Sequence, residues 1–91
     1  MSLHPSVDVT GRLIQSLIAE LTAGPMTEQR REDCRAIHRS MIAALNNALD
    51  LWGNGELTER DQEVLVTCSR MLGDIKTLVQ QACSEMRRRF D

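Results

Sequence analysis

Hydrophobic residues recur at helical spacing in three stretches of this 91-residue chain, and breaks containing glycine separate the stretches. In the first stretch the apolar positions share one side of a helix; they are Leu13, Ile14, Leu17, Ile18 and Leu21. This spacing predicts an amphipathic helix over about 8–22. Gly24-Pro25 follows, and glycine readily takes the left-handed conformation at a helix C-terminus while proline rarely continues the helix. We therefore expect the first helix to end before Gly24.

The second stretch carries two neighbouring rows of apolar positions. Thr27 can cap a helix with its hydroxyl, and Glu28 places negative charge in the first turn, where the helix dipole favours it. These signals predict a helix over about 28–52. Its first row comprises Cys34, Ile37, Met41, Ala44, Ala48 and Leu51, and its second row comprises His38, Ile42, Leu45, Leu49 and Trp52. Both rows alternate steps of three and four residues, so the predicted apolar face is broad.

A third helix is predicted after the turn at Gly53-Asn54-Gly55. Thr58 and Asp61 form the Ser/Thr-x-x-acid pattern in which the two side chains satisfy each other's backbone amides at a helix start. The apolar positions beyond are Val64, Cys68, Met71, Ile75, Leu78, Ala82 and Met86, widened by Leu65, Leu72 and Val79. A helix over about 59–89 follows. We expect an all-α chain, one helical domain over residues 1–91, with a short N-terminal helix and a long antiparallel two-helix hairpin.

The width of the apolar rows predicts a partner. Each long helix can give only part of its apolar face to one neighbour, and a chain this short buries a limited fraction of its surface. Burying one Leu or Ile side chain contributes ~1.5–3 kcal/mol, so we expect a second polypeptide to cover the remainder. A homodimer resembling a four-helix bundle is the simplest cover. The expected protein-binding or dimer-interface residues are Ile37, Met41, Leu45, Leu49, Trp52, Cys68, Met71, Leu72, Ile75, Leu78 and Val79.

Composition and charge narrow the classes of partner. The formal charge is −2, and the eleven basic residues are mixed with thirteen acidic ones, so no nucleic-acid partner is expected. No stretch approaches the ~18 uninterrupted apolar residues of a membrane span, and the N-terminus lacks the pattern of a secretory signal. Three cysteines without close spacing indicate reduced thiols rather than a disulfide framework. A cytoplasmic protein is therefore expected.

Candidate chemistry is sparse. Cys34 and His38 lie four residues apart on one helix, but tetrahedral zinc needs two further ligands, and Cys68 and Cys83 are too far apart in sequence to suggest them. No metal or cofactor is therefore expected. Nucleophilic catalysis needs an activated thiol or hydroxyl in a pocket, and a thin helical hairpin is expected to offer no cleft. We expect no enzymatic activity.

Two further features each leave two interpretations open. The first half of the second helix is basic, with Arg30, Arg31, Arg35 and Arg39. These side chains form either a solvated face, paired locally with Glu28 and Glu32, or a rim that docks onto an acidic partner surface. Trp52, at the end of the same helix, is either a plug that closes one end of the bundle or an anchor for a binding partner.

The order of these features resembles a known class of regulator. A short Leu/Ile helix that ends in a Gly-Pro break (LIAELTAGP, residues 17–25) precedes a Thr-capped long helix carrying Ala36-Ile37-His38-Arg39, and a second long helix follows. This layout is similar to the small antiactivators of bacterial quorum sensing, of the TraM and QslA kind. The resemblance implies a helical dimer that binds a LuxR-type transcription factor, such as LasR, and blocks its dimerisation or its hold on DNA.

Two other functions remain open at this stage. Chaperones of type III secretion or of the flagellum are also small, acidic and helical, and they mask an apolar helix of an exported client. A purely structural coiled-coil subunit would instead form higher-order oligomers without a client.

Overall fold

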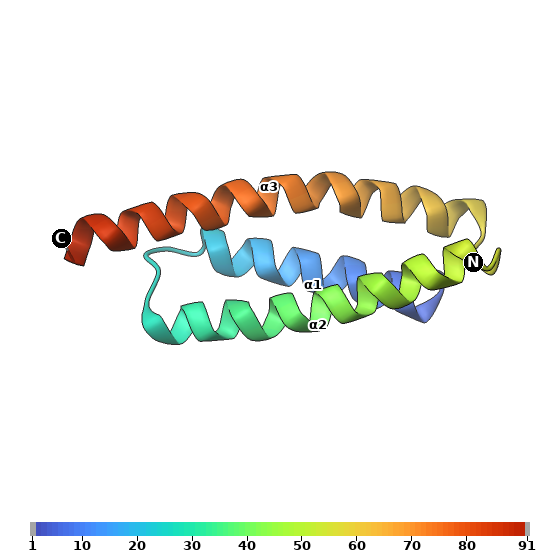
Figure 1. Cartoon of the computed structure of the whole chain (residues 1–91), viewed down its shortest axis with the longest axis horizontal. Helices are drawn as coiled ribbons and strands as arrows, with labels where there is room; N and C mark the ends of the chain where they lie inside the picture. Colours follow the sequence, from blue (N-terminus) through green and yellow to red (C-terminus); the bar gives the residue numbers. More distant parts are fainter. Residues whose placement is uncertain (1, 91) are drawn as a thin grey trace.

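The computed structural model describes residues 2–90, with side chains described for residues 2–81 and 84. It contains α1 (Pro5–Thr22), α2 (Glu28–Gly53) and α3 (Glu59–Phe90), so the predicted all-helical fold is confirmed. The molecule is a rod of about 50 × 21 × 20 Å (Figure 1). Over the residues described, none of these helices combines the length and hydropathy that a membrane crossing needs.

The short helix α1 lies between the two long ones (Figure 1). α1 and α3 run in the same direction and α2 runs opposite to both. α1 packs against α2 and against α3, whereas the backbones of α2 and α3 rarely come close to each other. The hairpin predicted from the sequence is therefore opened by the N-terminal helix, which is the centre of the bundle instead of an arm beside it.

α1 begins earlier than the sequence pattern indicated. Pro5 occupies the first turn, where the backbone N–H that it lacks would have no helical partner. The ring of His4 takes the place of a capping side chain, because its Nδ1 accepts a hydrogen bond from the backbone N–H of Ser6 at 3.2 Å. At the other end α1 stops at Thr22, and Gly24 has a φ of 137°, which favours glycine.

The predicted caps of the long helices are present. Thr27 Oγ1 accepts from the backbone N–H of Arg30 at 3.2 Å. Thr58 Oγ1 accepts from the N–H of Asp61 at 3.2 Å, and Asp61 Oδ2 accepts from the N–H of Thr58 at 3.1 Å. Asp61 Oδ1 also accepts from the N–H of His4 at 3.0 Å. One buried carboxylate therefore fastens the start of α1 to the start of α3.

The core consists of two clusters arranged around α1. The larger cluster comprises Ile14, Leu17, Met26, Cys34, Met41, Cys68 and Ile75. The smaller cluster comprises Val7, Ala48, Leu57 and Leu65. In both clusters α1 contributes fully buried side chains that meet residues of α2 and α3. Because α1 fills this position, it covers one apolar row of each long helix.

Candidate protein-binding surface

The two apolar rows of α2 have opposite exposures. Met41 and Ala48, in the first row, are 0% exposed and belong to the core. In the second row Ile42 is 36% exposed, Leu49 48% and Trp52 36%. α1 covers the first row, while the second row stays exposed except at Leu45, which is half-buried against the smaller core cluster. Trp52 belongs to neither core cluster, so it does not close the bundle as a buried plug would.

The predicted interface residues divide into three groups by burial. Met41, Cys68 and Ile75 are buried against α1, so a partner does not reach them while α1 is in place. The half-buried group is Ile37, Leu45, Met71, Leu72 and Leu78. The exposed group is Leu49, Trp52 and Val79. Ile42 is exposed as well. It is not among the predicted interface residues, although its place in the second row is a signal for including it.

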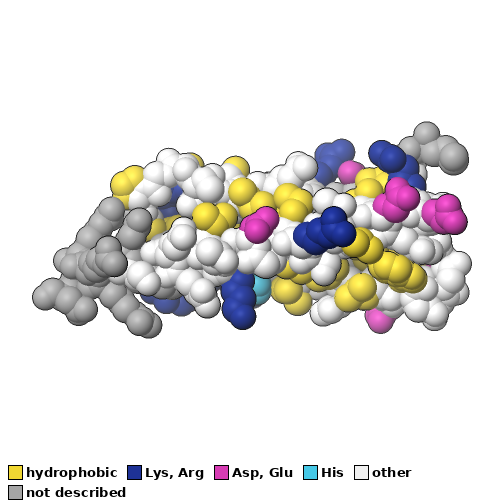
Figure 2. All heavy atoms as spheres, turned by 90° about the horizontal axis from the view of Figure 1, so that it is seen from above, with side chains coloured by type: hydrophobic (Ala, Val, Ile, Leu, Met, Phe, Trp, Pro, Cys, Tyr) yellow, Lys and Arg dark blue, Asp and Glu magenta, His cyan; other side chains and the backbone are white. Residues whose placement is uncertain are grey.

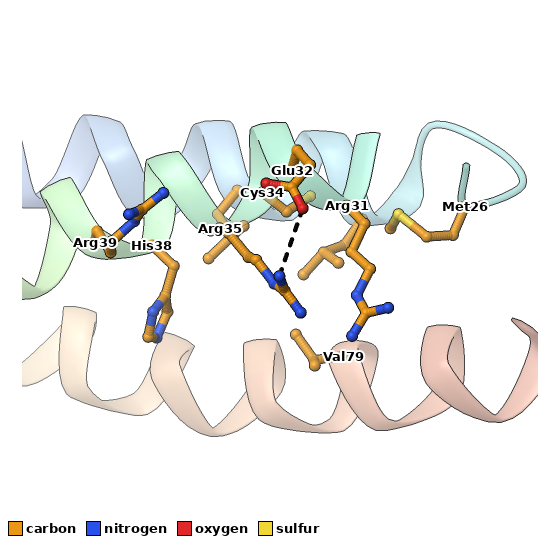
Figure 3. Close-up of a pocket in the computed structure, with 10 residues that line it drawn as sticks. Met26, Arg31, Glu32, Cys34, Arg35, His38, Arg39 and Val79 are labelled. Carbon is orange, nitrogen blue, oxygen red and sulfur yellow. Dashed lines mark hydrogen bonds and ion pairs between the residues drawn. The ribbon is translucent and has the colours of Figure 1, made fainter. Parts of the chain in front are cut away.

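A groove of about 680 Å³ opens between the first half of α2 and the second half of α3 (Figure 3). Its floor is apolar and comes from Leu17 and Leu21 of α1 and from Met26 of the following loop. Val79 lines it from α3. The expectation that a helical hairpin has no cleft is therefore wrong. The groove exists because α1 holds the two long helices apart.

Basic side chains line the α2 wall of this groove. Figure 3 shows Arg31, Arg35 and His38 extending from α2 towards α3. Arg35 Nη1 lies 3.5 Å from Glu32 Oε1, which is one of the local ion pairs expected from the sequence. Among the residues whose side chains are described, Arg31 has no ion pair. The wall therefore keeps positive charge beside an apolar floor.

Arg30 has a structural role that the sequence did not indicate. Its Nε lies 3.5 Å from Glu20 Oε2, and its guanidinium donates hydrogen bonds to the carbonyl oxygens of Glu20 and Pro25. These contacts tie the end of α1 to the start of α2. Arg30 thus stabilises the connection between α1 and α2, whereas Arg31 and Arg35 line the groove.

The thiols pack as small apolar groups. Burial raises the pKa of Cys34, and the nearby carboxylate of Glu20 raises it further, against an opposing effect of Arg30. Burial also raises the pKa of Cys68. Both thiols therefore stay protonated near neutral pH, which disfavours the thiolate that attacks substrates or binds metals. His38 lines the same groove as Cys34, and among the described residues no cluster of three metal-ligating side chains forms.

The exposed row and the basic groove form one continuous surface, because His38 lines the groove and lies one helical turn before Ile42. We name this surface the α2 docking face. It comprises Arg31, Arg35, His38, Ile42, Leu45, Leu49 and Trp52. Seen from above (Figure 2), exposed hydrophobic side chains lie along the length of the rod, with basic and acidic side chains among them. In that view α3 is nearest the viewer. The α2 docking face itself combines the apolar contact area of Ile42, Leu49 and Trp52 with the charge of Arg31 and Arg35.

Comparison with protein-family models, curated proteins and solved structures found no match for this chain. The functional argument therefore depends on the surface itself.

Proposed function

We propose that this chain is a regulatory protein without catalytic activity that binds another protein through the α2 docking face. The supporting observation is the row of Ile42, Leu49 and Trp52, three large apolar side chains left exposed on one side of one helix. A soluble protein rarely exposes apolar side chains contiguously unless a partner covers them. Tryptophan at the end of such a row is the residue type that most often dominates a protein interface.

The shape of the face favours a helix as the partner's docking element. Its residues repeat at alternating steps of three and four, which is the spacing that meets the apolar stripe of another helix. The groove at one end supplies an apolar floor and a basic wall. A partner helix with apolar residues along one side and acidic residues towards one end would match both parts.

The same face gives the chain a means of self-association. A second copy presents the same apolar row, and pairing the two rows would remove Leu49 and Trp52 of both copies from water. We propose a homodimer of this kind for the protein without its partner, which gives an assembly of the four-helix-bundle type around the two α2 helices.

We propose a LuxR-type transcription factor, such as LasR, as the partner, with the chain acting as a quorum-sensing antiactivator. This identification rests on the resemblance in layout described above. By covering a helix of the regulator, the chain would prevent the regulator from dimerising or from binding DNA. A type III secretion or flagellar chaperone would use the same face to mask an apolar helix of its client.

The test is to mix the purified chain with a purified LuxR-type regulator in its ligand-bound form. We expect a complex on size-exclusion chromatography with light scattering, and loss of the regulator's band shift on its DNA site as the chain is added. A regulator that keeps its dimer and its DNA binding with the chain in excess would refute the antiactivator proposal.

Matched variants locate the contact. Leu49→Glu places a charge in the docking face, whereas Val66→Glu places the same charge at an apolar residue of similar exposure on α3. We expect the first variant to lose the complex and the second to keep it. Equal loss in both variants would argue against the α2 docking face. Solubilisation of an exported client by the chain, with no effect on the regulator, would favour the chaperone.

A further inference from the structure

Charge is segregated along the α2 docking face. At one end the lining of the groove carries Arg31, Arg35 and Arg39 against one acidic residue, Glu32, and His38 lies beside them. At the other end, at and beyond the close of α2, the exposed acidic residues are Asp50, Glu56 and Glu59, with Arg60 as the exposed basic residue among them. Two such faces attract each other when they run in opposite directions and repel when they run in the same direction.

The outer positions of the face match their own reverse about a point midway between Leu45 and Leu49. Leu45 and Leu49 are equally far from that point, and so are Ile42 and Trp52. Reversing the helix about this point therefore brings Leu45 onto Leu49 and Ile42 onto Trp52. It also brings the basic end of one copy to the acidic end of the other.

We propose that a second copy of this chain occupies the α2 docking face, running antiparallel, with the two-fold axis midway between Leu45 and Leu49. This inference rests on the self-association part of the proposed function and adds its direction and register. The interface is self-complementary, so each contact occurs twice. Trp52 of one copy packs against Ile42 of the other, and Leu45 packs against Leu49.

This arrangement has a regulatory consequence. In the dimer, the acidic end of the second copy lies opposite Arg31 and Arg35, the same side chains that a partner helix with acidic residues would contact. The partner and the second copy therefore compete for one surface. Partner binding therefore requires that the homodimer dissociate. A higher concentration of the chain increases the fraction that is dimeric and cannot bind the partner.

Disulfide formation between introduced cysteines tests the direction. In a Cys83→Ser background we would compare Ile42→Cys alone, Trp52→Cys alone and a mixture of the two under mild oxidation. Positions 42 and 52 lie about 15 Å apart along α2 at 1.5 Å per residue. We expect each variant alone to remain free and the mixture to cross-link. Self-cross-linking of each variant alone would show a parallel pair and overturn the inference.

Exchange of charges is a second test that leaves the apolar row intact. Arg31→Glu with Arg35→Glu, and separately Glu56→Arg with Glu59→Arg, are each expected to weaken self-association roughly tenfold or more. An equimolar mixture of the two double variants should associate again, because each supplies the charges that the other lacks. Weakening without recovery in the mixture would refute the antiparallel arrangement.

The outcomes separate this inference from the proposed function. A chain that sedimentation shows to be monomeric at every accessible concentration refutes the homodimer and the antiparallel inference together, while the test with the LuxR-type regulator still decides partner binding. A dimer that cross-links in the parallel pattern refutes the antiparallel arrangement alone.

Discussion

The two apolar rows of α2 have the same alternating spacing but differ in exposure. We call the first row, which contains Met41, the inner row, and the second row, which contains Leu49, the outer row. The inner row, which faces α1, uses Cys34, Met41 and Ala48, which are small or flexible and let α1 approach closely. The outer row uses bulkier residues, Leu49 and Trp52 among them, and α1 leaves them exposed. Three large apolar side chains of this helix, Ile42, Leu49 and Trp52, thus lie outside both core clusters. The inner row thus serves folding, and in the proposed function the outer row serves association.

The largest effect expected is on stability and comes from the inner row. Met41→Ala removes a fully buried side chain and leaves a cavity, so we expect the free energy of unfolding to fall by ~2–5 kcal/mol. Urea unfolding followed by circular dichroism at low protein concentration measures it. The outer-row variant Leu49→Ala should change the same quantity by less than about 1 kcal/mol. An equal fall in the free energy of unfolding of the two variants would show that both rows contribute equally to folding.

The next effect is on association and comes from the outer row. Trp52→Ala should weaken self-association by about 2 kcal/mol or more, which is over tenfold in the dissociation constant. Sedimentation equilibrium measures it. Val66→Ala, on α3, is the matched control and should leave the dissociation constant unchanged. A Trp52 variant that dimerises like the parent chain would remove the outer row from the interface.

A smaller effect on stability is expected from the carboxylate that fastens α1 over the inner row. The hydrogen bond from the His4 backbone, with those from Thr58, lowers the pKa of Asp61. Stabilisation by this carboxylate is therefore fully present above the ordinary aspartate pKa and is lost as pH falls through the lowered value. Asp61→Asn should lower Tm at neutral pH and flatten the decline of Tm at acidic pH. An unchanged decline in the variant would mean that other groups cause it.

The smallest effect expected is that of salt. Raising ionic strength shortens the reach of charge interactions to ~3 Å at 1 M, so the pairing of basic and acidic ends should weaken while apolar contacts persist. We expect the dissociation constant to rise by a few-fold between low and high salt, and unfolding of the monomer to change little. Light scattering across a sodium chloride series measures it. Tighter association in high salt would point to an interface that is apolar throughout.

The local parts of the fold were predictable from the sequence, and their arrangement was not. Thr27 and Thr58 mark the starts of α2 and α3. A capping hydroxyl binds a backbone N–H only a few residues further on, so the sequence alone shows both partners. The start of α1 was placed too late because Pro5 precedes the periodic residues and the cap is a histidine ring.

The candidate site was predictable in part for the same reason. The second row of α2 was visible as a pattern, but its exposure depends on where α1 packs, which involves residues far apart in sequence. The periodicity therefore listed Met41 and Leu49 as equivalent interface residues, although α1 buries one and leaves the other exposed. The groove was missed because it arises between α2 and α3, whose separation is set by the third helix.

Trp52 offers the most direct test that another polypeptide covers the outer row of α2, because it is the only tryptophan in the chain and lies in that row. The measurement is acrylamide quenching of its fluorescence over a dilution series, from the highest soluble concentration down to nanomolar. The account predicts weak quenching at high concentration that strengthens on dilution, with the midpoint at the dissociation constant found by sedimentation. Strong quenching that stays the same at every concentration, and after addition of the protein partner, would contradict it.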